Sequence, residues 1–294
     1  MNRNTAILIA ILVILVIATW FVLQRPGEQS LAESGGRTVL SIDSAAVDRI
    51  DIQSPQDSIT LVRQGADWFI DHPMHYRANQ QSAKALVGAL KNAQVRTLVS
   101  DNPEKQSLFQ VDSSGTMVTI SQNGKQAGSL IVGKMGPSYT DAYTRVAGTN
   151  DVILTDASLY YGTRRSVTEW RDKDITNMPK EQIKNIGFQY GDTTFAMTWR
   201  DSVWMIGSKV VPSGLANPLV TSLSHFETDE FLPSLPSHPH LVATINVETI
   251  QLKFFQVKGS DKYVVQSSAS PQVFQIQGWR ANQVLKRKNA LVPA

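Results

Sequence analysis

The chain has 294 residues, of which 42% are apolar and 18% are charged, a balance typical of a folded globular protein rather than a disordered one. Its 28 basic and 25 acidic residues are scattered and leave a formal charge of only +3, which argues against the basic stripe of a nucleic-acid-binding protein. With no cysteine, disulfides, thiolate metal sites and a cysteine nucleophile are excluded.

The first predicted element is an apolar stretch near the N-terminus. Thr5 to Leu23 contains no charged residue, and as a helix it would cover about 28 Å, close to the ~30 Å hydrocarbon core of a bilayer. It predicts an uncleaved membrane anchor, with Trp20 in the outer interfacial belt. A cleaved signal peptide, with its site at residues 30–32, and a buried helix of a soluble protein are the alternatives.

The position of this stretch also predicts a topology. A short tail before a long downstream region suits a helix that leaves the amino end in the cytoplasm. We therefore expect a single-pass membrane protein whose C-terminal region lies outside the cytoplasm. Residues 1–24 would be the cytoplasmic tail and anchor. Residues 25–38, which contain Pro, Gly and Ser without periodicity, would be a flexible tether.

Residues 47–70 predict three short strands, because their apolar residues alternate as half-buried strands require. The next apolar residues fall at helical spacing between 83 and 93. After them, residues 117–134 predict a strand pair around Asn123-Gly124, a favoured hairpin turn, and residues 142–156 predict another pair. The first part of the chain thus predicts a hairpin with a third strand, a packed helix and a further group of strands.

The same order returns further along the chain. Residues 183–206 align with residues 47–70 without a gap, so that Trp204 falls on Trp68. A helix is predicted from near Leu215, with Pro218 in its first turn, where proline is tolerated. Residues 242–278 resemble the second group of strands.

This pattern predicts the fold class. We expect an α+β fold of mainly antiparallel sheets with small packed helices, internally duplicated in the order A-B-A-B, behind one N-terminal transmembrane helix. The first half would be residues 39–179 and the second half residues 180–294. Because Trp68 and Trp204 occupy the same place in a repeated strand, we interpret them as core residues rather than as a glycan platform.

A mixed-charge segment at residues 164–174 is the candidate docking site. Such segments are usually solvated surface, but arginine and tryptophan are favoured in interface hot spots. The candidate partner-docking residues are Arg164, Arg165, Trp170 and Arg171.

No pattern predicts a cofactor, a metal or a catalytic group. The five histidines have no carboxylate at a recognised ligand spacing, so we interpret them as solvated loop residues. They are His72, His75, His225, His238 and His240. Neither Gly-x-Ser-x-Gly, Ser-x-x-Lys nor a Walker lysine motif occurs, so an envelope hydrolase is a minor alternative and any ATPase would be another chain.

The motifs also resemble a known family. DRIDI, W-x-I, LIVGK, AYTRV, VILTD and WRDKDI, behind one apolar segment, are similar to the domain-of-unknown-function family 4340 over residues 46–232. SLFQVD at 107–112 departs from the family pattern, which has a tyrosine-glycine-leucine sequence before a proline. The resemblance implies a bacterial envelope protein, since some members lie near or are fused to ABC-type transport systems of the gliding-motility kind. It transfers no catalytic residues.

These observations predict a non-catalytic, membrane-anchored accessory or scaffold subunit of an envelope complex. Its expected partners are the inner membrane, through the N-terminal helix, and other envelope proteins such as an ABC transporter permease or an ATPase-bearing complex. Nucleic acid is not an expected partner. The alternative is a periplasmic module that binds a glycan or a small solute in the cleft between the two halves.

Overall fold

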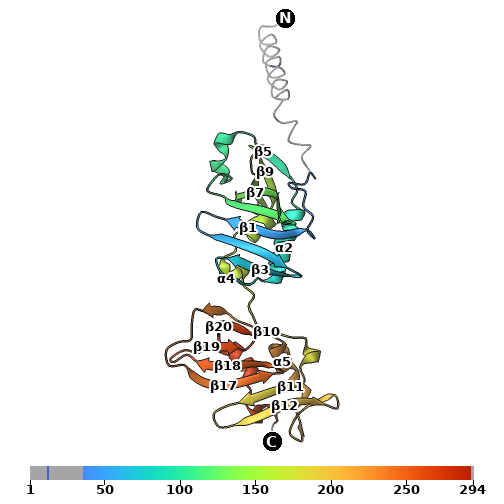
Figure 1. Ribbon diagram of the computed structural model, residues 1–294, viewed down its shortest axis with the longest axis vertical. Coiled ribbons are helices and arrows are strands. Elements are labelled where there is room, and N and C mark those ends of the chain that lie inside the picture. The colour runs from blue at the N-terminus through green and yellow to red at the C-terminus, as the bar shows by residue number, and fades with distance from the viewer. Residues whose placement is uncertain (1–11, 13–35, 293–294) are drawn as a thin grey trace, which may run out of the picture. The chain divides into compact units, whose positions relative to one another are not determined.

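The computed structural model describes residues 12 and 36–292. They form two compact units (Figure 1): unit 1 ends at Asp172 and unit 2 begins at Lys173. No described helix is both long and apolar enough to cross a membrane. The predicted anchor residues Thr5, Trp20 and Leu23 lie outside the described residues.

Unit 1 is built on one sheet, in which the strand pairs are antiparallel. In spatial order the strands are β4 (Tyr76–Arg77), β3 (Asp67–His72), β2 (Ser58–Gln64), β1 (Val47–Gln53), β6 (Thr116–Gln122), β7 (Lys125–Met135), β8 (Asp141–Val146), β9 (Val152–Asp156) and β5 (Thr97–Ser100). The helices are α2 (Gln80–Lys91), α3 (Ser158–Thr163) and α4 (Val167–Trp170), with short 3₁₀ turns η1 (Pro103–Lys105) and η2 (Ser107–Phe109).

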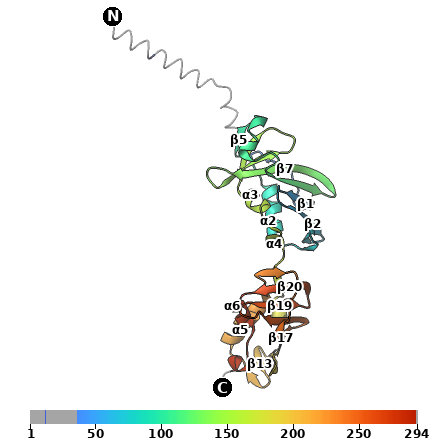
Figure 2. The same ribbon diagram turned by 90° about the vertical axis from the view of Figure 1, so that its left-hand side faces the viewer.

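Alternation of apolar residues explains the core of unit 1. Ile50 and Ile52 of β1 stand opposite Leu61 and Ile59 of β2, and paired residues share one face of a sheet. Helix α2 covers that face with Ala83, Leu86, Val87 and Leu90, and it packs on α3 (Figure 2). The predicted helix and the predicted strands of residues 47–70 are therefore confirmed.

A tight turn between β6 and β7 and a pair of hydrogen bonds between α2 and β3 fix the local geometry of unit 1. The β6–β7 hairpin turns at Asn123 and Gly124, whose φ angles of 50° and 74° are those of a type I′ turn, as predicted. The side chain of Gln80 at the start of α2 accepts from the backbone N–H of Trp68 at 2.8 Å and donates to its carbonyl at 2.9 Å. Helix α2 is thus tied to the tryptophan of β3.

Unit 2 has a sheet with a corresponding spatial order. Its strands are β14 (Lys209–Val210), β13 (Val203–Ile206), β12 (Thr194–Arg200), β11 (Asn185–Gln189), β17 (His240–Val247), β18 (Ile250–Gln256), β19 (Tyr263–Ser267), β20 (Ser270–Ile276) and β16 (Glu230–Leu232). The helices are α5 (Ser213–Ser224), α6 (Gly278–Val284) and α7 (Lys288–Leu291), with the turn η3 (Lys180–Gln182). A separate two-stranded ribbon pairs β10 (Asp174–Asn177) with β15 (His225–Glu227).

The core of unit 2 follows the same rule as that of unit 1. Ile186 and Phe188 of β11 stand opposite Met197 and Phe195 of β12, and α5 covers this face. The prediction for α5 was wrong in one respect, because the helix begins at Ser213 and Pro218 therefore lies inside it rather than in its first turn. The missing N–H of proline there removes one bond of the helical ladder.

The mainly antiparallel α+β fold is confirmed. At both ends of each sheet the edge strand is short: β4 and β14 have 2 residues, β5 has 4 and β16 has 3. Short edges limit pairing with a strand from another chain. The surfaces that a partner can use are therefore sheet faces and grooves more than sheet edges.

Candidate functional site

The mixed-charge segment at residues 164–174 includes α4 of unit 1, which spans Val167–Trp170. Ser166 caps the helix, since its hydroxyl accepts from the N–H of Glu169 and the Glu169 carboxylate accepts from the N–H of Ser166 at 2.8 Å. Just before the cap, the Arg164 guanidinium lies 4.6 Å from the ring centre of Tyr160. The charges of Arg164 and Glu169 are therefore engaged within unit 1.

Trp170 and Arg171 do not lie at the surface. Trp170 is 0% exposed and belongs to the core of unit 1, and its carbonyl accepts from the N–H of Asn79 at 2.7 Å. Arg171 is buried against the ring of Tyr76, 4.6 Å from the ring centre, and this burial lowers its pKa although Tyr76 opposes the shift. A partner cannot reach Trp170. Of the four predicted docking residues, only Arg164 and Arg165 are accessible.

Those two arginines line a groove of about 350 Å³. Arg164 also donates to the carbonyl of Gly133 at 3.3 Å, whereas the Nε of Arg165 is buried and has no hydrogen-bond partner among the described residues. The Arg165 guanidinium lies over the buried Trp170 ring, 5.9 Å from its centre. The rest of the polar lining consists of Ser54, Gln56, Asp57, Thr116, Thr163, Ser166 and Glu169. This mixture of donors and acids suits a polar segment carrying both charges.

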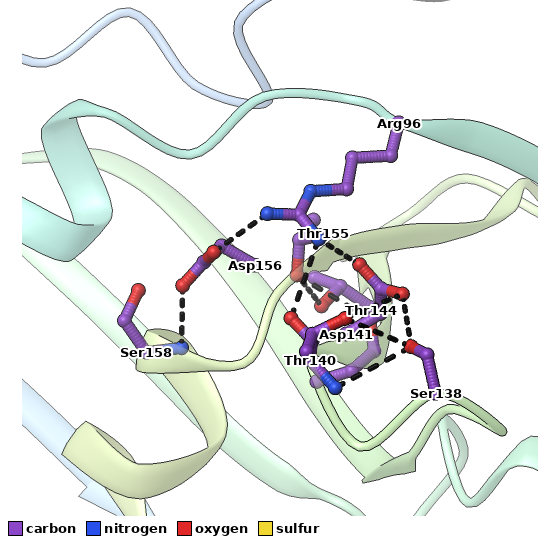
Figure 3. Close-up of polar contacts among 9 residues, drawn as sticks. Arg96, Ser138, Thr140, Asp141, Thr144, Thr155, Asp156 and Ser158 are labelled. Atoms are coloured by element: carbon purple, nitrogen blue, oxygen red, sulfur yellow. Dashed lines mark hydrogen bonds and ion pairs between the residues drawn. The ribbon is translucent and has the colours of Figure 1, made fainter.

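A polar network at the other end of the unit 1 sheet is shown in Figure 3. Arg96 pairs with Asp141 and, at 2.7 Å, with Asp156. A hydrogen bond from Ser138 and the Arg96 pair lower the pKa of Asp141, and the N–H of Ser158 lowers that of Asp156. Both acids stay ionised and joined to their neighbours, so this network holds β8, β9 and the start of α3 together.

Arg96 and Asp156 also border a cavity of about 660 Å³ beside the C-terminal end of α2. Sequence reasoning missed this network. Asp156 belongs to the VILTD motif, but Arg96 reaches it only because β5 pairs with β9 at the sheet edge. No local spacing in the chain indicates that contact.

A second groove lies in unit 2 beside α5 and has a volume of about 410 Å³. Its wall contains Trp199, which is 37% exposed and packs edge-on against the buried Trp204 at 5.5 Å. The Nζ of Lys184 lies 5.3 Å from the centre of the Trp199 ring. Asn217 of α5 adds an amide to the lining. An aromatic wall with an amide and an ammonium group can hold a small polar ligand.

Trp68 and Trp204 are buried as predicted, at 3% and 5% exposed. The five histidines are all exposed, as expected for solvated side chains. The expectation that they stand in loops was wrong for three of them, since His72 ends β3, His225 begins β15 and His240 begins β17. His225 also stands between the carboxylates of Glu227, two residues along its own strand, and Asp174, which is distant in the sequence.

The outer faces of the two sheets, opposite the helices, differ. In unit 1, Arg49 donates two hydrogen bonds of 2.8 Å to Asp51, and Thr60 donates one of 2.7 Å to the same carboxylate. Burial works to raise the pKa of Asp51, but these hydrogen bonds outweigh it and hold the pKa below its usual range. The aligned residues of unit 2 are Asn185, Gly187 and Ala196, which carry no charge.

On the same face of unit 2, further uncharged residues lie on the neighbouring strands, beside the exposed Arg200. Thr198 pairs with Met205, and Met205 pairs with Val210, so the three share one face with Ala196. Val210 is 54% exposed and Val203, opposite Arg200 on the same face, is 36% exposed. We call this surface the outer patch, made of Asn185, Gly187, Ala196, Thr198, Val203, Met205 and Val210.

Comparison with known proteins gives one match. Residues 68–242 match the family described as "Domain of unknown function (DUF4340)", a match that begins at the tryptophan of β3 and ends in β17. No curated protein and no solved structure matches the chain.

Proposed function

The chain belongs to the DUF4340 family, and we propose that this member is a non-catalytic, membrane-anchored accessory or scaffold subunit of a bacterial envelope complex. The stretch Thr5–Leu23 would hold it in the inner membrane with the C-terminal region in the periplasm. Its partner would be an envelope protein such as the permease of an ABC-type transporter. Anchoring raises the effective concentration of the chain at that partner.

The observation that carries this proposal is the outer patch of unit 2. A solvent-facing sheet surface is usually polar, and the same surface of unit 1 is occupied by the Arg49–Asp51 ion pair. In unit 2 the equivalent positions carry no charge, and two valines stand exposed beside them. Interface cores are depleted of charge in this way, so the patch fits another protein surface.

An exchange of residues between the two units tests the proposal. The triple variant N185R/G187D/A196T places the unit 1 residues on the unit 2 face, and a Cβ at Gly187 would meet Asn246 at 3.6 Å, an ordinary contact. The variant should fold and lose the stoichiometric partner that copurifies with the wild-type chain from detergent. The reverse exchange in unit 1, R49N/D51G/T60A, is the matched control and should keep the partner.

Two results would count against the proposal. The wild-type chain could purify from detergent-solubilised membranes with no stoichiometric partner. Alternatively, the triple variant could retain the partner while the unit 1 control loses it, which would move the interface to unit 1.

A second candidate function, a periplasmic ligand-binding module, is favoured by the groove at Trp199. An exposed indole stacks on the apolar face of a sugar ring, and Asn217 could bind its polar groups. A tetrasaccharide of N-acetylglucosamine should then raise the thermal midpoint of the full-length chain in detergent. W199A should abolish the rise, while W279A, which removes another exposed tryptophan of the same unit, should not. A wild-type chain unaffected by the sugar would remove the basis for this candidate.

We also infer that the two units derive from one ancestral unit in the order A-B-A-B. The gapless alignment of residues 47–70 with 183–206 supports this origin, as does the corresponding order of strands in the two sheets. The exchange variants above depend on this correspondence, because they treat residues 136 positions apart as equivalent, as in Trp68 and Trp204.

A further inference from the structure

The β10–β15 ribbon at the start of unit 2 gathers three side chains with metal-binding atoms. The strands are antiparallel, with Asp174 opposite Glu227 and Asn177 opposite His225. Phe226 of the same ribbon is buried in the core of unit 2. Asp174, His225 and Glu227 are turned outward, so that the ribbon has an apolar inner face and a polar outer face.

The three outer side chains are close together. Nδ1 of His225 lies 3.2 Å from Oδ1 of Asp174, and its Nε2 lies 3.5 Å from Oε1 of Glu227. One ligand atom from each residue can be chosen so that all three lie within 4.8 Å of one another. The imidazole is 57% exposed, so it is free to turn and present one nitrogen to both carboxylates.

The backbone and a neighbouring amide hold this arrangement in place. The N–H of Thr228 donates to the carbonyl of Lys173 at 2.9 Å at one end of the ribbon, and the N–H of Met178 donates to Ser224 at 2.8 Å at the other. Asn177 donates from its amide to Oδ2 of Asp174 at 2.6 Å, which leaves Oδ1 directed at His225. Outer hydrogen bonds of this kind orient metal ligands.

We propose that Asp174, His225 and Glu227 form a binding site for a divalent transition-metal ion of the zinc type. Carboxylates at directly opposed positions of two strands repel each other, and a cation between them would relieve that repulsion. An imidazole nitrogen selects zinc and its neighbours over magnesium and calcium, which prefer oxygen ligands. Ligand distances of about 2.0–2.2 Å require only a small contraction of the cluster.

Metal binding would have a structural consequence. The ion joins β10, which is the first strand of unit 2, to β15, which follows helix α5 in the chain. It therefore stabilises the beginning of unit 2 by linkage, because a ligand that binds the folded state alone shifts the unfolding equilibrium. This role is independent of the outer patch and does not rest on the proposed scaffold function.

Zinc chloride is the probe for the test. The full-length chain is prepared in detergent without a histidine tag, treated with a chelator, dialysed and titrated by calorimetry, with magnesium chloride as the comparison. We expect one zinc ion per chain, no magnesium binding, and a zinc-dependent rise in the thermal midpoint. H225A and the isosteric E227Q should each weaken zinc binding at least tenfold and abolish the rise.

H240A is the matched control, since it removes another exposed histidine of unit 2 that lies outside the cluster, and it should bind zinc like the wild type. The metal-free thermal midpoints of the variants show whether each one folds. The proposal is overturned if the wild-type chain shows no saturable zinc binding, or if a folded H225A or E227Q binds zinc as tightly as the wild type.

Discussion

The sheets of units 1 and 2 are similar on the inside and different on the outside. Their buried faces carry aligned pairs such as Ile50 and Ile186, or Trp68 and Trp204, all of them in the cores. Their outer faces carry the Arg49–Asp51 ion pair in unit 1 and, at the aligned positions of unit 2, the uncharged residues Asn185 and Gly187. Packing constrains a core position in the same way in both units, whereas an outer position is free to differ. Function is therefore to be sought where the aligned positions differ.

The largest effect is expected at the buried faces of the two sheets, where the aligned residues are similar. Trp68→Ala and Trp204→Ala should each cost about 3 to 5 kcal/mol of stability, because each removes a large buried ring from the same place in its sheet. Chemical denaturation of the full chain measures the cost. If either variant unfolds like the wild type, that tryptophan is not a core residue and the equivalence of the two sheets breaks down.

A smaller effect is expected at a contact described in unit 1. Gln80→Ala removes the amide that bonds both backbone groups of Trp68 and the carbonyl of Ala78. The N–H of Trp68 and the carbonyl of Ala78 lose this partner, whereas the carbonyl of Trp68 keeps its hydrogen bond from the N–H of Ala78. The expected cost is about 2 kcal/mol. Hydrogen exchange should show the loss of protection in β3. Gln81→Ala, at the next position of α2, is the control and should leave β3 protected.

The smallest expected effect concerns the outer ion pair. Asp51→Asn should cost about 1 kcal/mol or less at neutral pH, because the Arg49 side chain is 44% exposed and solvent screens the pair. The folded-state pKa of Asp51 lies below that of the unfolded chain. Its contribution is therefore fully present above the unfolded pKa of about 3.9 and is lost as the pH falls through the folded pKa.

Stability measured against pH checks this sign. Asp51→Asn should reduce the loss of unfolding free energy as the pH falls below about 4. Gly187→Asn, at the aligned position of unit 2, should leave this acid part of the curve unchanged. An acid part of the curve that does not respond to Asp51→Asn would show that the ion pair contributes no stability.

Local patterns in the sequence predicted much of the fold. The alternation within residues 47–70, the Asn123-Gly124 turn and the helical spacing after residue 83 all depend on near neighbours, and each was confirmed. The start of α5 was missed because Pro218 is tolerated inside a helix whose apolar face is well packed. Helix propensity alone does not indicate how well the helix packs on the sheet.

The candidate sites depend on contacts between distant residues and were predicted less well. Trp170 stands in a charged segment that is typical of surface, yet α2 and the sheet enclose it. His225 meets Asp174 only because β15 pairs with β10. The difference between the outer faces emerges only when register shows which side of each strand points away from the helices.

Site-specific photocrosslinking in native membranes tests most directly whether the outer patch of unit 2 is the surface that binds the partner. A photoreactive residue is placed at Arg200, opposite Val203 at the end of the patch, or at the aligned and equally exposed Gln64 of unit 1. We predict an adduct with one envelope protein from position 200 and none from position 64. An adduct from position 64 alone would contradict this prediction.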